Sequence, residues 1–353
     1  ADATAAAGHE RDPAGELLRC RHDLTMAGRR PARRIGGLAS WPLPMDVAPT
    51  RSQRLLGLTA VVAAILCFGM SSGIIKWPGA PGSVIAWWRL IGSSILWWSL
   101  TLTLRFARDR PLPTRSSIVA STPAALCSGV QIARYCTAVT KTSIAHAEFI
   151  AALAPLLIIP TGFLVFHEQP NWKALRWGVL SVAGLAIVLT SGPDAGVATW
   201  EGDVLMAGVL VLTVAYYSTS KYARGKGVPI IDFMSTIMVI GLVTATPVAL
   251  VLAGDELWPL TWQTWVSVGL LSVLTGMAGH GLLFYAHRSV PIATISVMQV
   301  GQPALGAFWG WLIVGETIAP AQVPGMILVM AGIGLVVWSS QRAVGSPAPA
   351  TSG

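Results

Sequence analysis

The side chains of this chain that could do chemistry are ionisable groups set inside long apolar runs. Arg89, Arg134, His146 and Glu148 all lie within such runs. Because a charge at membrane depth is costly, such residues mark solute sites or proton relays. An arginine binds a carboxylate, and Glu148 would accept an amine or a coupling proton, which predicts a site for a zwitterionic or anionic solute. The alternative is a structural ion pair, with one arginine extending to the membrane surface.

The second half of the chain adds uncharged polar side chains at membrane depth. His280 is either a packed neutral histidine or a residue of the solute pathway. Gln299 and Gln302 place two amides one turn apart, and the adjacent Tyr216 and Tyr217 are candidates for a cavity wall. All five are therefore counted with the predicted solute-binding residues, and no residue is predicted to be catalytic.

One stretch of the chain occurs twice. Residues 155–184 and 303–332 superimpose without a gap at an offset of 148 (303 − 155). The informative matches are Pro155 with Pro303, Gly162 with Gly310, Glu168 with Glu316 and Gly184 with Gly332. Such residues rarely match by chance between apolar segments, so the repeat predicts an internal duplication.

The repeated prolines and glutamates have separate physical interpretations. Pro155 and Pro303 are predicted inside helices, where proline frees a carbonyl and kinks the chain. Because freed backbone groups are tolerated in a membrane where they line a cavity, both prolines should mark the solute pathway. Glu168 and Glu316 fall just past helix ends and are expected to cap the first amides of the following helices, with a gating role as the alternative.

The composition is that of a membrane protein. Of the 353 residues, 53% are hydrophobic and only 11% charged, whereas soluble domains carry about 25% charge. The net charge of +8 does not indicate nucleic-acid binding, since nine of the 24 Lys and Arg residues precede Leu55 and most others fall between apolar runs. The four cysteines lack metal-ligand spacing, so neither a metal, a cofactor nor a disulfide framework is predicted.

Ten apolar runs have the length that crosses a bilayer as a helix. They cover residues 55–75, 83–104, 117–138, 143–165, 172–191, 203–222, 231–253, 263–286, 291–314 and 321–339. The connections on one side hold most of the basic residues and those on the other only Lys76 and Lys141, which places both termini in the cytoplasm. Two copies of five helices must run in opposite directions, an arrangement typical of secondary transporters.

The predicted fold class is therefore an all-α membrane protein of ten transmembrane helices in two inverted five-helix repeats. Residues 51–192 are expected to form the first repeat and residues 202–340 the second. Residues 1–50, which lack the apolar core of a signal peptide, are expected to be a disordered cytoplasmic tail, and residues 341–353 a disordered C-terminal tail. Nucleotide-binding motifs and a nucleophile elbow do not occur in the sequence, which disfavours an enzyme.

The two repeat ends, "LAPLLIIPTGFLVFHEQPNWKALRWGVLSVAGLAIVLTSG" and "VGQPALGAFWGWLIVGETIAPAQVPGMILVMAGIGLVVW", resemble those of the drug/metabolite transporter superfamily, specifically the EamA-type ten-helix exporters. The resemblance covers about residues 55–340 and includes Arg89 in the second helix. It implies a cavity surrounded by helices one, three, four, six, eight and nine, with helices five and ten peripheral. Members export amino acids, related metabolites or drugs. His167, before Glu168, departs from the family pattern.

The predicted function is a secondary transporter that exports small metabolites, such as amino acids or related zwitterionic solutes, by alternating access, with proton coupling as one way to drive it. The alternatives are a multidrug or toxic-compound exporter of the same fold and a non-transporting membrane scaffold. The expected partners are a small-molecule solute, membrane lipid and, with proton coupling, protons, but no nucleic acid. The expected state is a monomer or homodimer in the bacterial inner membrane.

Overall fold

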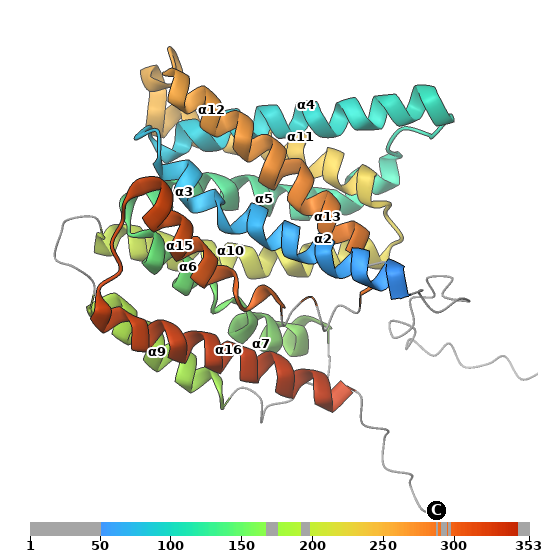
Figure 1. The fold of residues 1–353 in the computed structure, drawn as a ribbon. Coiled ribbons are helices and arrows are strands. Elements are labelled where there is room, and N and C mark those ends of the chain that lie inside the picture. Colours follow the sequence, from blue (N-terminus) through green and yellow to red (C-terminus); the bar gives the residue numbers. More distant parts are fainter. Residues whose placement is uncertain are drawn as a thin grey trace, which may run out of the picture. The chain divides into compact units, whose positions relative to one another are not determined.

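The computed structural model describes residues 51–166, 176–191, 198–286, 289–290, 295 and 298–344, and in these ranges the chain is helical and forms no strand (Figure 1). The all-α class is thereby confirmed. The elements are α2 (Arg51–Gly69), α3 (Ser71–Lys76), α4 (Gly82–Arg108), α5 (Arg115–Lys141), α6 (Ile144–Ala151), α7 (Ala154–Phe166), α9 (Gly178–Thr190), α10 (Trp200–Gly225), α11 (Ile230–Ala253), η1 (Gly254–Leu257), α12 (Trp262–Leu270), η2 (Leu271–Gly279), α13 (His280–Ala286), α15 (Gln302–Val314), η3 (Pro320–Gln322) and α16 (Val323–Val344). Glu168, His167 and residues 1–50 lie outside the described residues.

Seven helical stretches in the described part are long and apolar enough to cross a membrane: Arg51–Lys76, Gly82–Arg108, Ile144–Val165, Trp200–Ala223, Ile230–Leu257, Trp262–Leu283 and Pro320–Ser339. Helix α5 has 27 residues but is less apolar, and α9 and α15 have 13 residues each. Their positions correspond to the remaining predicted runs, so the pattern is compatible with ten spans. The protein is a multi-pass membrane protein.

Helix starts follow local sequence signals. The side chains of Thr114, Ser143 and Thr261 each accept a hydrogen bond from a backbone amide in the first turn of α5, α6 and α12, respectively. These caps satisfy amides that have no partner within the helix. The cap of α6 is the most consequential, because it begins a separate short helix directly after α5 ends.

The repeated prolines follow short breaks within the fourth and ninth predicted runs and stand at the starts of α7 and α15. Pro155 is the second residue of α7, after a break that separates α7 from α6, and Pro303 is the second residue of α15. Proline is well tolerated there, because an amide in the first helical turn lacks an intrahelical acceptor in any case. Both prolines therefore mark discontinuities at corresponding places in the two halves.

Helix packing is similar in the two halves: helices pack against their counterparts, and a contact between two helices recurs between the corresponding helices. Helix α9 packs on α16, α6 on α15, and α4 on α11, which are corresponding pairs; the contact of α5 with α10 is matched by that of α2 with η2 and α13. Figure 1 shows α9 and α16 side by side. A Cβ on Gly184 would lie 2.6 Å from Gly325 O, and one on Gly332 would lie 2.2 Å from Ser181 Oγ, so these glycines serve close packing. The repeat boundaries stay a prediction, and α16 continues to Val344, beyond the predicted start of the tail at residue 341.

The largest apolar core lies among α4, α5, α10 and α11, with Ile85, Leu90 and Met234 almost fully buried. Large apolar side chains such as Phe106 and Val251 are instead exposed, each at 83%. Lipid is the solvent that suits such a surface. The bundle thus exposes large apolar side chains on its outside as well as burying them inside.

Candidate functional site

A cavity of about 1200 Å³ lies among the helices. Its lining includes most of the residues singled out in the sequence: Arg89, Glu148, Pro155, Tyr216, Tyr217, His280, Gln299, Gln302 and Pro303. The volume exceeds the roughly 300–1,000 Å³ of ordinary ligand pockets. Side chains from both halves of the chain meet on this wall.

The helices around the cavity differ in part from those that the family resemblance implied. Helix α9, the fifth run, contributes no residue to the described lining and is peripheral, as expected. Helix α16, the tenth run, was also expected to be peripheral, but Val329, Ile333 and Val337 line the cavity. Helices α4 and α11 contribute as well. Helix α16 packs against α9 and α7, and α7 contributes Pro155 and Ile158 to the same lining.

Glu148 is the buried acid of this cavity, with only 4% of its surface exposed. Its Oε1 accepts hydrogen bonds from Ser72 Oγ and, at 3.5 Å, from Tyr135 OH. Ser72 and Tyr135 also bond each other at 2.8 Å. The second carboxylate oxygen, Oε2, has no hydrogen-bond partner among the described residues and is not fully enclosed, so it is left to the cavity.

The position of Glu148 depends on glycines of the opposite half. A Cβ on Gly306 would lie 2.5 Å from Glu148 Cγ, and one on Gly310 would lie 2.9 Å from Ile144 Cδ1. These glycines are one helical turn apart on α15, so their bare backbone forms the strip against which α6 packs. The carboxylate therefore reaches the cavity only because α15 has no side chain at residue 306.

Arg89 lies on α4 and supplies the positive charge on the cavity wall. No described carboxylate lies within 4.0 Å of its guanidinium. The ion pair of Glu148 with Arg89 or Arg134, one of the two alternatives from the sequence, is thus absent from the described structure. Arg89 is consequently a cation without a protein counter-ion in that part of the chain.

Arg134 and His146 are not brought to this cavity. Arg134 is exposed on α5, away from the described lining. His146 points to the other side of α6, where Nδ1 lies 3.1 Å from each carboxylate oxygen of Asp203. Position within apolar runs did not predict proximity, because such residues can lie on opposite faces of their helices.

His280 stands where an irregular helix ends. Residues Leu271–Gly279 form a π-helix, and His280 Nδ1 donates to Thr275 O at 2.7 Å. Its ring also packs edge-on against Phe68, with the centroids 5.1 Å apart. π-helical turns are uncommon and are often found at functional sites. Here the wider turn places the imidazole on the cavity wall.

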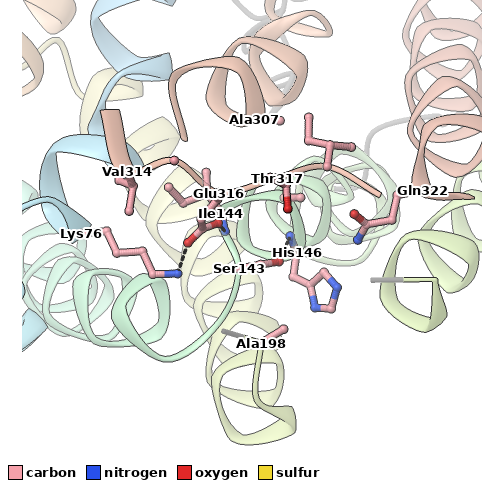
Figure 2. A pocket seen from close by; sticks show the side chains of 13 residues that line it. Lys76, Ser143, Ile144, His146, Ala198, Ala307, Val314, Glu316, Thr317 and Gln322 are labelled. Atoms are coloured by element: carbon pink, nitrogen blue, oxygen red, sulfur yellow. Dashed lines mark hydrogen bonds and ion pairs between the residues drawn. The ribbon is translucent and has the colours of Figure 1, made fainter. Parts of the chain in front are cut away.

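A second, smaller pocket of about 360 Å³ lies at the N-terminal end of α6 (Figure 2). Lys76, at the end of α3, forms an ion pair there with Glu316. Glu316 Oε2 accepts the backbone amide of Ile144 at 2.8 Å. Glu316 was expected to cap the helix that follows it, but it caps α6 instead, because the turn at Gly315 directs the chain back toward α6.

Sequence reasoning missed Ser72, Tyr135, Lys76 and Asp203. Ser and Tyr in apolar helices are common, and most such hydroxyls bond the backbone of their own helix, so no pattern distinguished these two. Lys76 had been assigned to a connection between helices, and Asp203 was the first residue of the predicted run 203–222. Their counterparts, Glu316 and His146, were recognised, but partners far apart in the sequence are joined only by the fold.

The described part of the chain is a multi-pass helical bundle with an internal cavity. Residues 200–338 match the sequence model of the EamA-like transporter family. The threonine/homoserine exporter RhtA of Salmonella typhimurium (strain LT2) is 29% identical over 159 residues, 44% of this chain and 51% of that protein; RhtA of Escherichia coli (strain K12) is 26% identical over the same shares. The match thus spans about half the length of these exporters. An uncharacterized transporter of Archaeoglobus fulgidus is 25% identical over 59% of this chain and 72% of its own length.

A solved crystal structure superimposes with a TM-score of 0.51 at 20% identity, over 84% of this chain and all of that one. This likeness concerns the fold alone. The match over residues 200–338 and the sequence relatives, which are named as exporters or transporters, make the chain similar to the EamA-like transporter family. This is a family of transporters, and its bacterial members support an inner-membrane location.

Proposed function

We propose that the protein exports small zwitterionic metabolites, amino acids among them, by alternating access. The observation that carries the proposal is the pair of opposite charges on one cavity wall: Arg89 without a carboxylate partner, and Glu148 with Oε2 facing the cavity. A solute carboxylate suits the guanidinium, and a solute ammonium suits the carboxylate. Export of threonine and homoserine by the named relatives supports the same solute class.

Opposite charges that lie on one cavity and are not paired with each other favour a solute that brings both complementary charges. A buried charge without a partner is costly, and a zwitterion would compensate Arg89 and Glu148 together. A neutral apolar drug would compensate neither. The polar groups of Gln299, Gln302 and His280 add neutral contacts around this pair.

Counterflow in proteoliposomes tests this function. Purified protein is reconstituted with an excess of one unlabelled amino acid, and uptake of the labelled form is followed for a panel of zwitterionic, anionic and cationic solutes. We expect saturable counterflow for zwitterions, reduced by Arg89→Gln but not by the matched control Arg134→Gln, which removes an exposed arginine outside the cavity lining. Equal flux through protein-free liposomes for the whole panel would reject the proposal.

A second candidate is a multidrug exporter, and the cavity volume favours it. About 1200 Å³ is more than a small amino acid fills, and Tyr216 and Tyr217, with ring centroids 5.6 Å apart, offer an aromatic surface. Competition of lipophilic cations with labelled amino acid in the same assay separates the two functions. A non-transporting scaffold would show neither counterflow nor competition.

A further inference from the structure

We propose that the ion pair between Lys76 and Glu316, anchored on the first amide of α6, is the outer gate of the transport pathway, and that the small pocket beside it is the outer vestibule. This inference rests on the proposed transport function. It adds an element that the solute site alone does not require: a specific latch that closes one end of the bundle. The pair joins the two halves, since Lys76 belongs to the first and Glu316 to the second.

The latch connects four chain segments through few atoms. Lys76 Nζ donates to Glu316 Oε1 (Figure 2). It also donates to Thr142 O, the carbonyl after α5, while Glu316 Oε2 accepts Ile144 N at 2.8 Å. The side chains of Lys76 and Glu316 are only 13% and 14% exposed. Charge-assisted bonds of this kind are stronger than neutral ones, and shielding from water reduces their screening. Both charged groups are thereby paired within the latch.

The latch lies on the wall of the small pocket, which is separate from the large cavity. The residues that line the small pocket and those that line the large cavity have no member in common in the described part of the chain. Helix α6 lies between them, with Glu148 on the cavity and Ile144 and His146 on the pocket. The contacts of α6 with Gly306 and Gly310 on α15 are so close that they leave no room for a solute to pass.

Helix α6 is built to move as a unit. It has eight residues, begins after the extended residues Thr142 and Ser143, and ends at the break before α7. Short helices between two breaks can shift as rigid bodies when the flanking residues absorb the change. A solute that leaves the cavity past α6 must separate α6 from α15, and this movement breaks the bond from Ile144 N to Glu316. Solute binding at Glu148 and closure at Glu316 are therefore linked through one short helix.

Neighbouring polar contacts distinguish the latch from other ion pairs. At the same end, His146 and Thr142 both bond Asp203 on α10, so α6 also has a partner on that side. Lys141 and Glu201 form a more exposed pair there, with side chains 43% and 60% exposed. The ion pair at the opposite end, Arg110 with Asp232, joins α4 to α11 and does not involve α6 or α15.

Accessibility of a single cysteine tests the gate without any knowledge of the solute. All native cysteines (Cys20, Cys67, Cys127 and Cys136) are replaced, and Ala154→Cys is introduced on the cavity wall. A membrane-impermeant thiol reagent is then applied to vesicles of both orientations. In the parent protein we expect slow labelling from the side that Lys76 and Glu316 face and faster labelling from the other side.

The diagnostic variant is Glu316→Gln, which keeps an acceptor oxygen for Ile144 N but removes the charge that pairs with Lys76. We expect labelling from the latch side to become about ten-fold faster, as for a ten-fold shift in the closed–open equilibrium. The control is Glu201→Gln, which removes an equal charge from the exposed pair at the same end and should leave the rate unchanged. Lys76→Met should act like Glu316→Gln, and the double variant should add little to either single variant.

The outcomes separate the latch from the transport function. Equal latch-side labelling of Glu316→Gln and Glu201→Gln would overturn the latch, whatever the counterflow result. Faster labelling of Glu316→Gln, without counterflow of any solute in the parent, would support a gate but reject zwitterion export. Because Lys76→Met tests the same bond from the other partner, a folding defect of one variant does not decide the result.

Discussion

Gly306 of α15 lies directly against Glu148 of α6: a Cβ on the glycine would stand 2.5 Å from Cγ and 2.6 Å from Cδ of the glutamate. The only carboxylate described on the cavity wall is therefore positioned by the absence of a side chain in the other half of the protein. Movement of α15 relative to α6 must change the surroundings of this carboxylate. The relationship leads to the first of four predictions.

Gly306→Ala should displace Glu148 and impair transport. The added methyl group collides with the carboxylate side chain, and overpacking of this kind typically costs about 1–3 kcal/mol of stability. We expect a lower melting temperature and a reduced counterflow rate. Gly208→Ala on α10 is the matched control, because a Cβ there meets no atom within 4 Å. Equal melting temperatures and counterflow rates of the two variants would show that α15 can shift to accommodate the methyl group at residue 306.

Glu148→Gln should abolish the pH dependence of export if Glu148 carries the coupling proton. The amide retains an oxygen for Ser72 and Tyr135 but does not titrate, so the protein should stay folded. Flux measured with and without an imposed pH gradient shows whether the pH dependence is lost in Glu148→Gln. Glu148→Leu should in addition destabilise the protein by about 1–3 kcal/mol for each buried hydroxyl left without its acceptor. Unchanged pH-dependent flux through Glu148→Gln would assign the residue to structure.

Tyr135→Phe should weaken the hydrogen bonding that orients the Glu148 carboxylate without removing the charge of Glu148. The hydroxyl of Tyr135 bonds Ser72 at 2.8 Å and Ser71 at 3.3 Å, and loss of such bonds costs about 0.5–1.5 kcal/mol each. We expect a small loss of thermal stability and a higher KM for counterflow. Tyr222→Phe serves as the control, since Tyr222 is 49% exposed and stacks on Lys226. A KM equal to that of the parent would show that Ser72 alone orients the carboxylate.

Arg89→Lys should preserve more function than Arg89→Gln for solutes that carry a carboxylate. A lysine keeps the charge but loses the two-pronged guanidinium, whereas glutamine loses both. Because a hydrogen bond to a charged group contributes about 1.5–3 kcal/mol, KM should rise by roughly ten-fold or more in Arg89→Gln. Decarboxylated analogues of the solute should lose little further affinity in this variant. An equal loss for both kinds of solute would mean that Arg89 acts on the fold instead.

Several parts of the site were predictable because they depend on local chemistry. Arg89, Glu148, His280 and the two prolines stood out as polar or helix-breaking residues in apolar runs, and all of them line the cavity. Arg134 and His146 stood out for the same reason but lie elsewhere. Sequence position determines depth in a membrane helix, but the direction of a side chain depends on how each helix is rotated about its axis.

The partners of the predicted residues depend on contacts across long separations in sequence. Glu148 meets Ser72 across 76 residues, and Glu316 meets Lys76 across 240. Hydroxyls and single lysines near helix ends are too common to indicate such pairs on their own. The packing of α6 on α15, through glycines of the second half, decides which of them come together.

The sequence by itself determined the membrane environment and the helical class, and it predicts a duplication. Apolar runs of this length must form helices in lipid, since backbone groups there have no other partners. The duplication is indicated by Pro, Gly and Glu residues that recur at the same spacing, whichever direction each copy runs across the membrane. Only the tertiary structure decided that Pro155 and Pro303 start helices, that Glu316 caps α6, and that Arg89 and Glu148 face one cavity without pairing. These features depend on how each helix is rotated about its axis and on how closely neighbouring helices approach. Both are set by the shapes of packed side chains and produce no recognisable pattern in a single sequence.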